Sequence, residues 1–580
     1  MAPAESIMRN VFQPYAFPDT RQLVQIHRRT SIQANTTALE DRATDVTLVI
    51  PAGTVVGSSI GSIENFGGIP FAEPATGPLR LKPPVRLNSS FGTVDARGFG
   101  PACPQMFFST DESSLLTSVL GNLLNTGLFQ TVTDQTEDCL TMRVQRPAGT
   151  AADAKLPVLF WIFGGGFELG SPQMYDGSGL VAQGVKIGKP FIFVSVNYRV
   201  GGFGFMPGAE ILADGSANLG LLDQRMGLEW TADNIAAFGG DPDKVTIWGE
   251  SAGAISVFDQ MALYNGDNTY NGSPLFRAAI MNSGSLAPAD PVDCPKGQII
   301  YDTVVAEAGC SSATDTLECL RSADYDTFLN AANSVPGILS YSSVALSYVP
   351  RPDGTALTQS PDVLASNGQY AAVPMIIGNQ EDEGTLFALF QPNITTGALI
   401  VSYLSEFFFH GATNDQLETL VATYDESITA GSPFRTSIFN NIYPQFKRLA
   451  AILGDLVFTL TRRAFLNVCT SVNPDVPAWS YLSSYDYGTP ILGTFHGSDL
   501  LQVFYGLLPN YASAATQTYY INFLYDLDPN DDADSYPNWP QWTESKQLMQ
   551  FNAGSSSLLS DDFRADSYDW IVSNIASLYL

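Results

Sequence analysis

Gly249-Glu250-Ser251-Ala252-Gly253 is the stretch of sequence that decides the fold. Residues 244–248 before it form a β-branched and aromatic run, which predicts a strand. Residues 254–258 after it are apolar and contain no Gly or Pro, which predicts a buried helix. A strand, a glycine turn and a helix are the setting in which a G-x-S-x-G pattern presents a nucleophilic serine. The glycines permit the sharp turn, and the helix would direct its first N–H groups at the reacting centre.

The same pattern occurs a second time, at Gly57-Ser58-Ser59-Ile60-Gly61. It lies between the β-type run 54–56 and a further run that starts at Ser62, and no helical stretch follows it. This setting predicts a strand or hairpin in which Ser59 has a structural role. The context therefore selects Ser251 as the candidate nucleophile.

The composition excludes two classes of protein. The 580 residues carry a net charge of −30, from 58 acidic and 28 basic residues, and such a surface repels nucleic-acid phosphates and anionic membranes. No apolar run reaches the roughly 18 residues of a transmembrane helix. We therefore expect neither a nucleic-acid-binding protein nor an integral membrane protein.

The length alone suggests roughly four domains, but the motifs favour fewer. Residues 1–44 are polar and without pattern, and we expect a poorly ordered extension there. Residues 45–580 are expected to form a single domain.

Several features favour secretion. The cysteine count is even, the chain is acidic, and the cysteines lack the C-x-x-C spacing of a zinc site. N-x-S/T sequons, which are candidate glycosylation sites, stand at Asn35, Asn88, Asn271 and Asn393. Residues 1–30 contain arginines but no continuous apolar core of a signal peptide. Either the signal was removed or replaced, or the chain leaves the cell by another route.

Continuous apolar runs predict strands that are buried on both faces of a parallel sheet. A helix is expected to start at Asn218 and to run toward Ala237. Strands that alternate with helices predict an α/β fold around a central sheet. The runs are residues 156–163, 190–196, 275–281 and 373–378.

The segment between Cys103 and Cys139 allows two interpretations. Its leucines at residues 115–129 fall at helical spacing and make one apolar stripe. The segment is either a helix that faces the core or a mobile flap, about residues 104–138, with its apolar side over an active site.

The base that activates a serine is usually a histidine, and the chain has only three. His27 lies in the N-terminal extension, and His410 follows three phenylalanines, where a packed or surface histidine is expected. His496 lies in a glycine-flanked loop late in the chain. We therefore predict His496 as the base.

The third catalytic group must be a carboxylate that orients the imidazole. In α/β-hydrolases it lies between the serine and the histidine in chain order. Glu383 follows the buried run 373–378, where a sheet carries catalytic loops, and is our choice. Asp382 and Asp486 are the alternatives.

The oxyanion of an acyl-transfer reaction needs preorganised backbone N–H donors. Gly164-Gly165-Gly166 follows an apolar strand and matches an HGGG-type donor loop, with Phe163 in place of the histidine. Gly165 and Gly166, with the N–H of Ala252, are the predicted oxyanion hole. The alternative is a glycine triplet that only serves tight packing.

Taken together, these motifs resemble the type-B carboxylesterase/lipase family, and within it the Candida rugosa-like fungal lipases and steryl esterases. The resemblance extends from about residue 45 to the C-terminus. It is carried by Phe163-Gly164-Gly165-Gly166-Phe167-Glu168, Gly249-Glu250-Ser251-Ala252-Gly253, Glu137-Asp138-Cys139-Leu140, Asp382-Glu383-Gly384-Thr385, residues 197–205 and residues 347–354.

The resemblance implies an α/β-hydrolase fold with a large, mostly parallel sheet, flanking helices and a disulfide-closed lid between Cys103 and Cys139. It implies Ser251, Glu383 and His496 as the triad and disulfides Cys103–Cys139 and Cys310–Cys319. Cys294 and Cys469 match no family bridge and are either free or joined in a third disulfide. It places Leu386, Phe387 and Phe495, and with them Ile255, along an apolar tunnel for the acyl chain.

The expected activity is hydrolysis of long-chain carboxylic esters, both steryl esters and acylglycerols, through an acyl-enzyme and without metal or cofactor. The expected partners are lipid interfaces or micelles, and a second copy of the chain through the apolar lid. The alternatives are a carboxylesterase for short-chain or aromatic esters and a non-catalytic adhesion protein of the cholinesterase-like kind.

Overall fold

The computed structural model describes residues 43–107, 134–485, 489–504, 510–530 and 535–580. The chain divides between Thr44 and Asp45, and nearly all of the described residues lie in the unit Asp45–Leu580. The expected extension and most of the expected lid lie outside the described residues.

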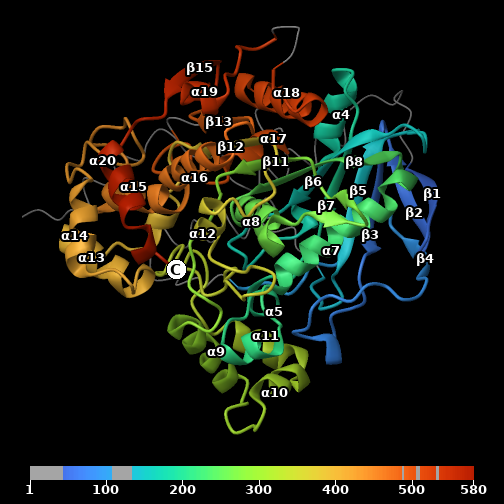
Figure 1. The fold of residues 1–580 in the computed structure, drawn as a ribbon, viewed down its shortest axis with the longest axis horizontal. Coiled ribbons are helices and arrows are strands. Elements are labelled where there is room, and N and C mark those ends of the chain that lie inside the picture. Colours follow the sequence, from blue (N-terminus) through green and yellow to red (C-terminus); the bar gives the residue numbers. More distant parts are fainter. Residues whose placement is uncertain (1–42, 108–133, 486–488, 505–509, 531–534) are drawn as a thin grey trace, which may run out of the picture. The chain divides into compact units, whose positions relative to one another are not determined.

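One sheet of 13 strands forms the centre of the described part of this unit (Figure 1). Its order is β1-β2-β3-β5-β7-β6-β8-β11-β12-β13-β14-β15, and β4 pairs with β2. The central neighbours from β7 to β14 are parallel, whereas β2–β3, β3–β5, β5–β7 and β14–β15 are antiparallel. The sheet is therefore mixed, with the parallel part in the middle, as predicted. The strands are β1 (Thr44–Ile50), β2 (Gly53–Ile60), β3 (Ile63–Pro70), β4 (Gly92–Asp95), β5 (Thr141–Pro147), β6 (Leu156–Ile162), β7 (Ile192–Val196), β8 (Gly240–Glu250), β11 (Ala278–Asn282), β12 (Met375–Gln380), β13 (Ala478–Ser483), β14 (Gln547–Asn552) and β15 (Ser555–Ser560), with β9 (Thr269–Tyr270) and β10 (Ser273–Pro274) as a separate pair.

Helices flank the sheet (Figure 1). The predicted helix after Asn218 is α7, and the predicted helix after the serine turn is α8. Among the described residues, no helix is long and apolar enough to cross a membrane. The helices are α4 (Ser178–Lys186), α5 (Gly201–Gly204), α6 (Ala209–Asp214), α7 (Leu219–Asn234), α8 (Ala252–Gly266), α9 (Pro295–Glu307), α10 (Thr316–Ser322), α11 (Tyr325–Ala332), α12 (Pro361–Ser366), α13 (Gly397–Tyr403), α14 (Asn414–Ala422), α15 (Phe446–Gly454), α16 (Leu460–Val472), α17 (Ser498–Val503), α18 (Tyr511–Asp526), α19 (Trp542–Ser545) and α20 (Ala565–Ser573), with short 3₁₀ or π segments η1 (Gly77–Leu79), η2 (Pro172–Met174), η3 (Ile235–Phe238), η4 (Phe387–Phe390), η5 (Leu404–Phe408), η6 (Asp455–Thr459) and η7 (Ile575–Ser577).

The apolar runs that predicted buried strands lie in the middle of the sheet. All residues of β7, β11, β12 and β13 are buried, as expected for strands covered on both faces. The second G-x-S-x-G stretch lies in the hairpin of β2 and β3, where Ser59 pairs with Glu64. The structural interpretation of Ser59 is therefore confirmed.

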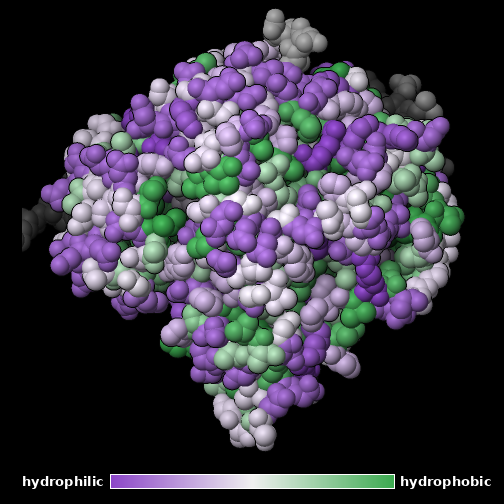
Figure 2. Space-filling model, viewed as in Figure 1, coloured by the Kyte–Doolittle hydropathy of each residue, from purple (hydrophilic) through white to green (hydrophobic). Residues whose placement is uncertain are grey.

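Two apolar clusters make up the core. The larger one surrounds the sheet and includes α8. The smaller one lies among η4 and helices α13 to α15, which Figure 1 shows as an orange group beside α20. On the face that Figure 2 shows, apolar residues form small groups among polar ones. The active-site elements described below come from both clusters.

Both predicted disulfides are present. Cys103–Cys139 has a Cα–Cα distance of 5.0 Å, and Cys310–Cys319 has one of 5.8 Å. Cys294 and Cys469 are free and buried, so they do not form the third disulfide that was the alternative.

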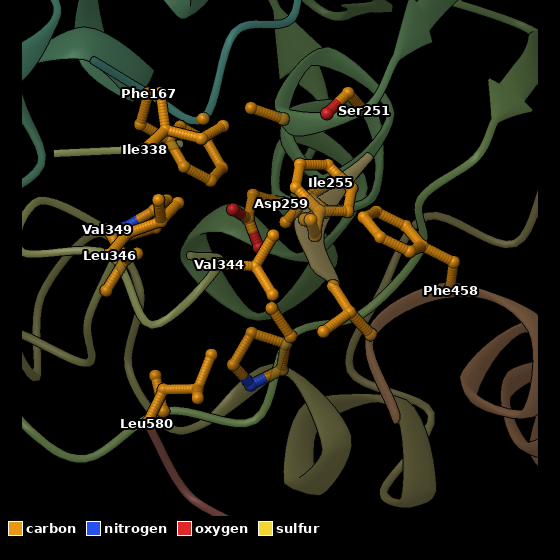
Figure 3. A pocket seen from close by; sticks show the side chains of 18 residues that line it. Phe167, Ser251, Ile255, Asp259, Ile338, Val344, Leu346, Val349, Phe458 and Leu580 are labelled. Carbon is orange, nitrogen blue, oxygen red and sulfur yellow. The ribbon is translucent and has the colours of Figure 1, made fainter. Parts of the chain in front are cut away.

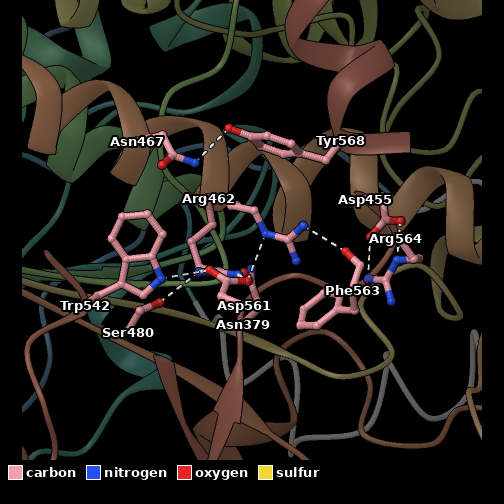
Figure 4. A network of polar contacts seen from close by, with 11 residues as sticks. Asn379, Asp455, Arg462, Asn467, Ser480, Trp542, Asp561, Phe563, Arg564 and Tyr568 are labelled. Carbon is pink, nitrogen blue, oxygen red and sulfur yellow. Dashed lines mark hydrogen bonds and ion pairs between the residues drawn. The ribbon is translucent and has the colours of Figure 1, made fainter. Parts of the chain in front are cut away.

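A buried ion cluster joins α16 to the segment after β15 (Figure 4). Arg462 donates two hydrogen bonds of 2.7 Å to Asp561, and Arg463 donates one of 2.9 Å to the same carboxylate. Arg462 Nε also donates to Asn379 Oδ1 on β12, over 2.9 Å. The guanidinium of Arg462 therefore connects the late chain to the strand that precedes Glu383.

Candidate active site

Ser251 occupies the turn between β8 and α8, with φ +58° and ψ −126°. The left-handed φ of a non-glycine residue is a strained conformation that functional sites retain. A Cβ on Gly249 would lie 2.3 Å from the backbone of Gly253, and a Cβ on Gly253 would lie 2.1 Å from the carbonyl oxygen of Ile162. Only glycine fits at either position, which is the reason for the pattern predicted from the sequence.

His496 and Glu383 meet where two neighbouring parallel strands end. Glu383 follows β12 and His496 follows β13, and the register pairs Gln380 with Ser483 at the ends of these strands. The Nδ1 of His496 lies 2.6 Å from Oε2 of Glu383. Because a carboxylate only accepts, Nδ1 carries the proton and Nε2 is left as the base.

The carboxylate of Glu383 is firmly held. Its other oxygen, Oε1, accepts hydrogen bonds from the backbone N–H of Gln380 at 2.7 Å and from Nδ2 of Asn379 at 3.2 Å. The side chain is buried. These bonds fix the orientation of the carboxylate, and through it the plane of the imidazole.

A second carboxyl group faces the same imidazole. Oε1 of Glu250 lies 3.4 Å from Nε2 of His496. Burial raises the pKa of Glu250 to about 8. Burial would lower the pKa of His496, but the charges of Glu250 and Glu383 and the hydrogen bond that His496 donates to Glu383 outweigh it, so that this pKa lies above its ordinary value. Nε2 makes no hydrogen bond to Ser251 or to any other described residue.

Two phenylalanines connect the imidazole to the space at Ser251. The ring centroid of Phe387 lies 5.0 Å from that of His496, and the centroid of Phe458 lies 4.4 Å from it. Both phenylalanines line a cavity to which Ser251 also contributes. The imidazole and the serine therefore belong to one site.

The glycine loop after β6 lies directly against the serine. A Cβ on Gly164 would lie 2.9 Å from Cβ of Ser251. Gly165 and Gly166 have φ values of +115° and +64°, which glycine adopts without strain. The N–H groups of Gly165, Gly166 and Ala252 donate to no residue that the structure describes. Free donors beside the nucleophile are the arrangement that an oxyanion hole requires.

The cavity at Ser251 is lined almost entirely by apolar side chains (Figure 3). It extends along one face of α8 and lies between the two apolar clusters, with Ile255 from the larger and Phe387 from the smaller. The lining is Gly166, Phe167, Ser251, Ala252, Ile255, Asp259, Ala287, Ala289, Ile338, Val344, Leu346, Val349, Pro350, Pro361, Phe387, Val457, Phe458 and Leu580.

The predicted tunnel residues divide into two pairs. Ile255 and Phe387 line the cavity, whereas Leu386 and Phe495 do not. Leu386 precedes Phe387 at the start of η4 and packs against the smaller cluster. Successive residues of such a turn point in different directions, so the two neighbours do not share one surface. Phe495 is half-buried, and its backbone bridges to Asp382.

The other candidates for the triad have different surroundings. Asp382 accepts hydrogen bonds from Ser432 and from the backbone of Phe434 and Thr494, and so joins two loops. His410 is exposed and contacts the backbone oxygen of Glu406. Asp486 and His27 lie outside the described residues. Of the candidates that can be compared, Glu383 is the carboxylate on the imidazole.

Sequence reasoning missed Glu250 and Asp259. Glu250 lies inside the motif itself, but only the structure shows it facing His496. Asp259 follows Ser251 and Ile255 at intervals of four residues along α8. This helical spacing was the signal that could have placed Asp259 in the cavity at Ser251.

The structure describes three of the four predicted glycosylation sites. Asn88, Asn271 and Asn393 are exposed, as glycosylation requires, and Asn35 lies outside the described residues. Within the described ranges, no group of three or more His, Cys, Asp or Glu side chains is arranged to hold a metal ion.

The serine turn, the histidine–glutamate pair and the parallel-centred sheet define an α/β-hydrolase. Residues 44–569 match the Carboxylesterase family, and the chain belongs to that family. It is a carboxylic ester hydrolase.

Individual relatives agree with this assignment. The secreted triacylglycerol lipase LIP1 of Gibberella zeae is 64% identical over 543 residues, which are 93% of this chain and 92% of the relative. Lipase 2 of Diutina rugosa is 48% identical over 532 residues, 91% of this chain and 96% of the relative. The crystal structure of Aspergillus niger EstA has a TM-score of 0.76 at 25% identity, and the match covers 93% of this chain and 99% of that one. The resemblance to Candida (Diutina) rugosa-like fungal lipases is thereby confirmed.

Proposed function

We propose that this protein is a secreted serine lipase that hydrolyses long-chain carboxylic esters, acylglycerols and steryl esters, through an acyl-enzyme. The observation that carries the proposal is the apolar cavity that starts at Ser251 and extends along α8. An acyl chain bound there removes its surface from water, which favours long chains by about 0.8 kcal/mol per methylene. The secreted lipases among the relatives support the same substrate class and location.

In the proposed mechanism, Nε2 of His496 takes the proton of Ser251 as its Oγ attacks the ester carbonyl. The N–H groups of Gly165, Gly166 and Ala252 stabilise the oxyanion. The imidazolium then protonates the departing alcohol. Water, activated by the same imidazole, releases the acid, and Glu383 holds the imidazole throughout. No step needs a metal or a cofactor.

The proposed partners are lipid–water interfaces and micelles. The lid and the dimer contact through it fall mainly within residues 108–133, outside the described residues, and stay predictions.

The test compares turnover of p-nitrophenyl esters of four and sixteen carbons, of a long-chain triacylglycerol and of cholesteryl oleate. We expect the long-chain substrates to have the higher kcat/KM, and Ser251→Ala to abolish turnover of all of them. Turnover of short esters alone would favour the soluble carboxylesterase. Full activity of Ser251→Ala would refute the mechanism, and a wild-type protein without esterase activity would favour the adhesion protein.

A further inference from the structure

Asp259 is a carboxyl group in the wall of the apolar cavity. Its side chain is fully buried, and neither carboxyl oxygen has a hydrogen-bond partner in the part of the chain that the structure describes. Figure 3 shows it beside Ile255 and Val344, with Ser251 at one end of the view and Leu580 at the other. The cavity therefore has one polar position well away from the serine.

The fold does not explain this residue. Burial alone raises the pKa of Asp259 to about 8, so the carboxyl group is neutral at pH 7. A buried polar group without a partner costs about 1–3 kcal/mol, and an apolar side chain at this position would avoid that cost. A buried polar group of this kind calls for a partner that the folded chain itself does not supply.

The position of Asp259 along the helix indicates where on a substrate the partner would lie. Asp259 follows Ser251 by eight residues on the same helix, which corresponds to about 12 Å along the axis. An extended chain spans roughly 1.2 Å per bond. An acyl chain that starts at Ser251 and follows α8 therefore brings its ninth or tenth carbon to Asp259.

We propose that Asp259 binds a hydroxyl group on the acyl chain, near the tenth carbon, and so makes the enzyme selective for esters of mid-chain hydroxylated fatty acids. A neutral carboxyl group can donate to the hydroxyl oxygen and accept from the hydroxyl proton, which gives partners to both of its oxygens. A plain acyl chain leaves the carboxyl group unpaired. This inference rests on the proposed function, because it assumes that the acyl chain occupies this cavity.

The experiment compares kcat/KM for the p-nitrophenyl esters of octadecanoic, 10-hydroxyoctadecanoic and 3-hydroxyoctadecanoic acid. We expect the wild-type protein to prefer the 10-hydroxy ester over the plain ester about five- to tenfold, because a site built for a hydroxyl rejects the analogue that lacks it. The 3-hydroxy ester has the same polarity but cannot reach Asp259, and should show no such gain.

Two variants test the assignment to this residue. Asp259→Leu should bring the ratio of 10-hydroxy to plain ester to one or below. Asp259→Asn keeps a donor and an acceptor in the same place and should retain most of the preference. Each ratio is measured within one protein sample, so a lower yield of folded protein does not affect it. Asp267→Asn, at an exposed aspartate just after the same helix, should keep the wild-type ratio.

Equal rates of the wild type on plain and 10-hydroxy esters would overturn the inference and leave the lipase standing. A preference for the 10-hydroxy ester that persists in Asp259→Leu would also overturn the inference and leave the lipase standing. A wild-type protein that turns over no octadecanoyl ester, but still cleaves short esters, would refute the proposed function and this inference with it.

Discussion

Glu250 and Glu383 lie at opposite nitrogens of His496. Glu383 accepts a hydrogen bond of 2.6 Å from Nδ1, whereas Glu250 lies 3.4 Å from Nε2, the nitrogen that takes the serine proton in the proposed mechanism. One carboxylate therefore orients the base, and the other adjoins its reactive side.

This asymmetry predicts unequal effects of two isosteric variants. Glu383→Gln would present an amide to Nδ1 and disturb the tautomer, so we expect kcat to fall by about 10²–10⁴. Glu250 makes no hydrogen bond to the imidazole, so Glu250→Gln should reduce kcat by no more than about tenfold. Both values come from steady-state hydrolysis of p-nitrophenyl butyrate at pH 7.5. Equal losses in the two variants would contradict these roles.

The pH profile of kcat/KM follows from the direction of the His496 shift. The base must be neutral, so activity falls as the pH drops through its pKa, which lies above the ordinary 6.5. Since Glu250 contributes to the raised pKa, Glu250→Gln should move the acid limb to lower pH. If the acid limb of the Glu250→Gln profile does not move, Glu250 has no electrostatic effect on the pKa of His496.

The buried cluster at Asp561 predicts a large loss of stability when the carboxylate is removed. Asp561→Asn leaves Arg462 and Arg463 as uncompensated buried charges, and we expect the free energy of unfolding at pH 7 to drop by about 3–5 kcal/mol. Urea denaturation followed by tryptophan fluorescence measures the difference.

The pKa of Asp561 also predicts how the difference in unfolding free energy between the wild type and Asp561→Asn depends on pH. Burial opposes ionisation of Asp561, but its two arginines lower the pKa to about 2. Its contribution is therefore present above pH 4 and is lost as the pH falls toward 2. The gap between the wild type and Asp561→Asn should close over that range, and a gap that is constant from pH 7 to pH 2 would contradict the assignment.

Asp259→Leu should stabilise the protein. The pKa of Asp259 is raised from 3.8 to about 8, so between these values the folded state holds a proton that the unfolded state has lost. Wild-type stability therefore falls with rising pH in this window, and the gain from the leucine should be larger at pH 8 than at pH 5. Thermal or urea unfolding at pH 5 and pH 8 measures it. A gain that is independent of pH would mean that the carboxyl group is not protonated in the cavity.

The sequence was most informative where a residue type has few alternatives. Glycines at 249 and 253 and the scarcity of histidine led to Ser251 and His496, because backbone crowding and proton transfer admit few other residues. The continuous apolar runs likewise predicted the parallel strands, because a strand without a polar face must be covered on both sides of the sheet.

The sequence did not show in which direction a given side chain points. Leu386 and Phe387 are adjacent and both apolar, yet only Phe387 lines the cavity, because packing of η4 against the smaller cluster decides which one faces the serine. Glu250 and Asp259 were overlooked because charged residues are rarely buried without a partner, and only the four-residue spacing from Ser251 through Ile255 pointed to Asp259.

The bond from Arg462 to Asn379 has a consequence for the maturation of the enzyme. Asn379 accepts from Arg462 and itself donates to Glu383, the carboxylate on the imidazole. Arg462 is in turn held by its ion pair with Asp561. Asp561 follows Ser251 by 310 residues, so translation reaches it long after the proposed nucleophile. The proposed base therefore gains this support only after translation has passed Asp561, and a nascent fragment that still lacks this residue would have its serine in place but an unsupported His496.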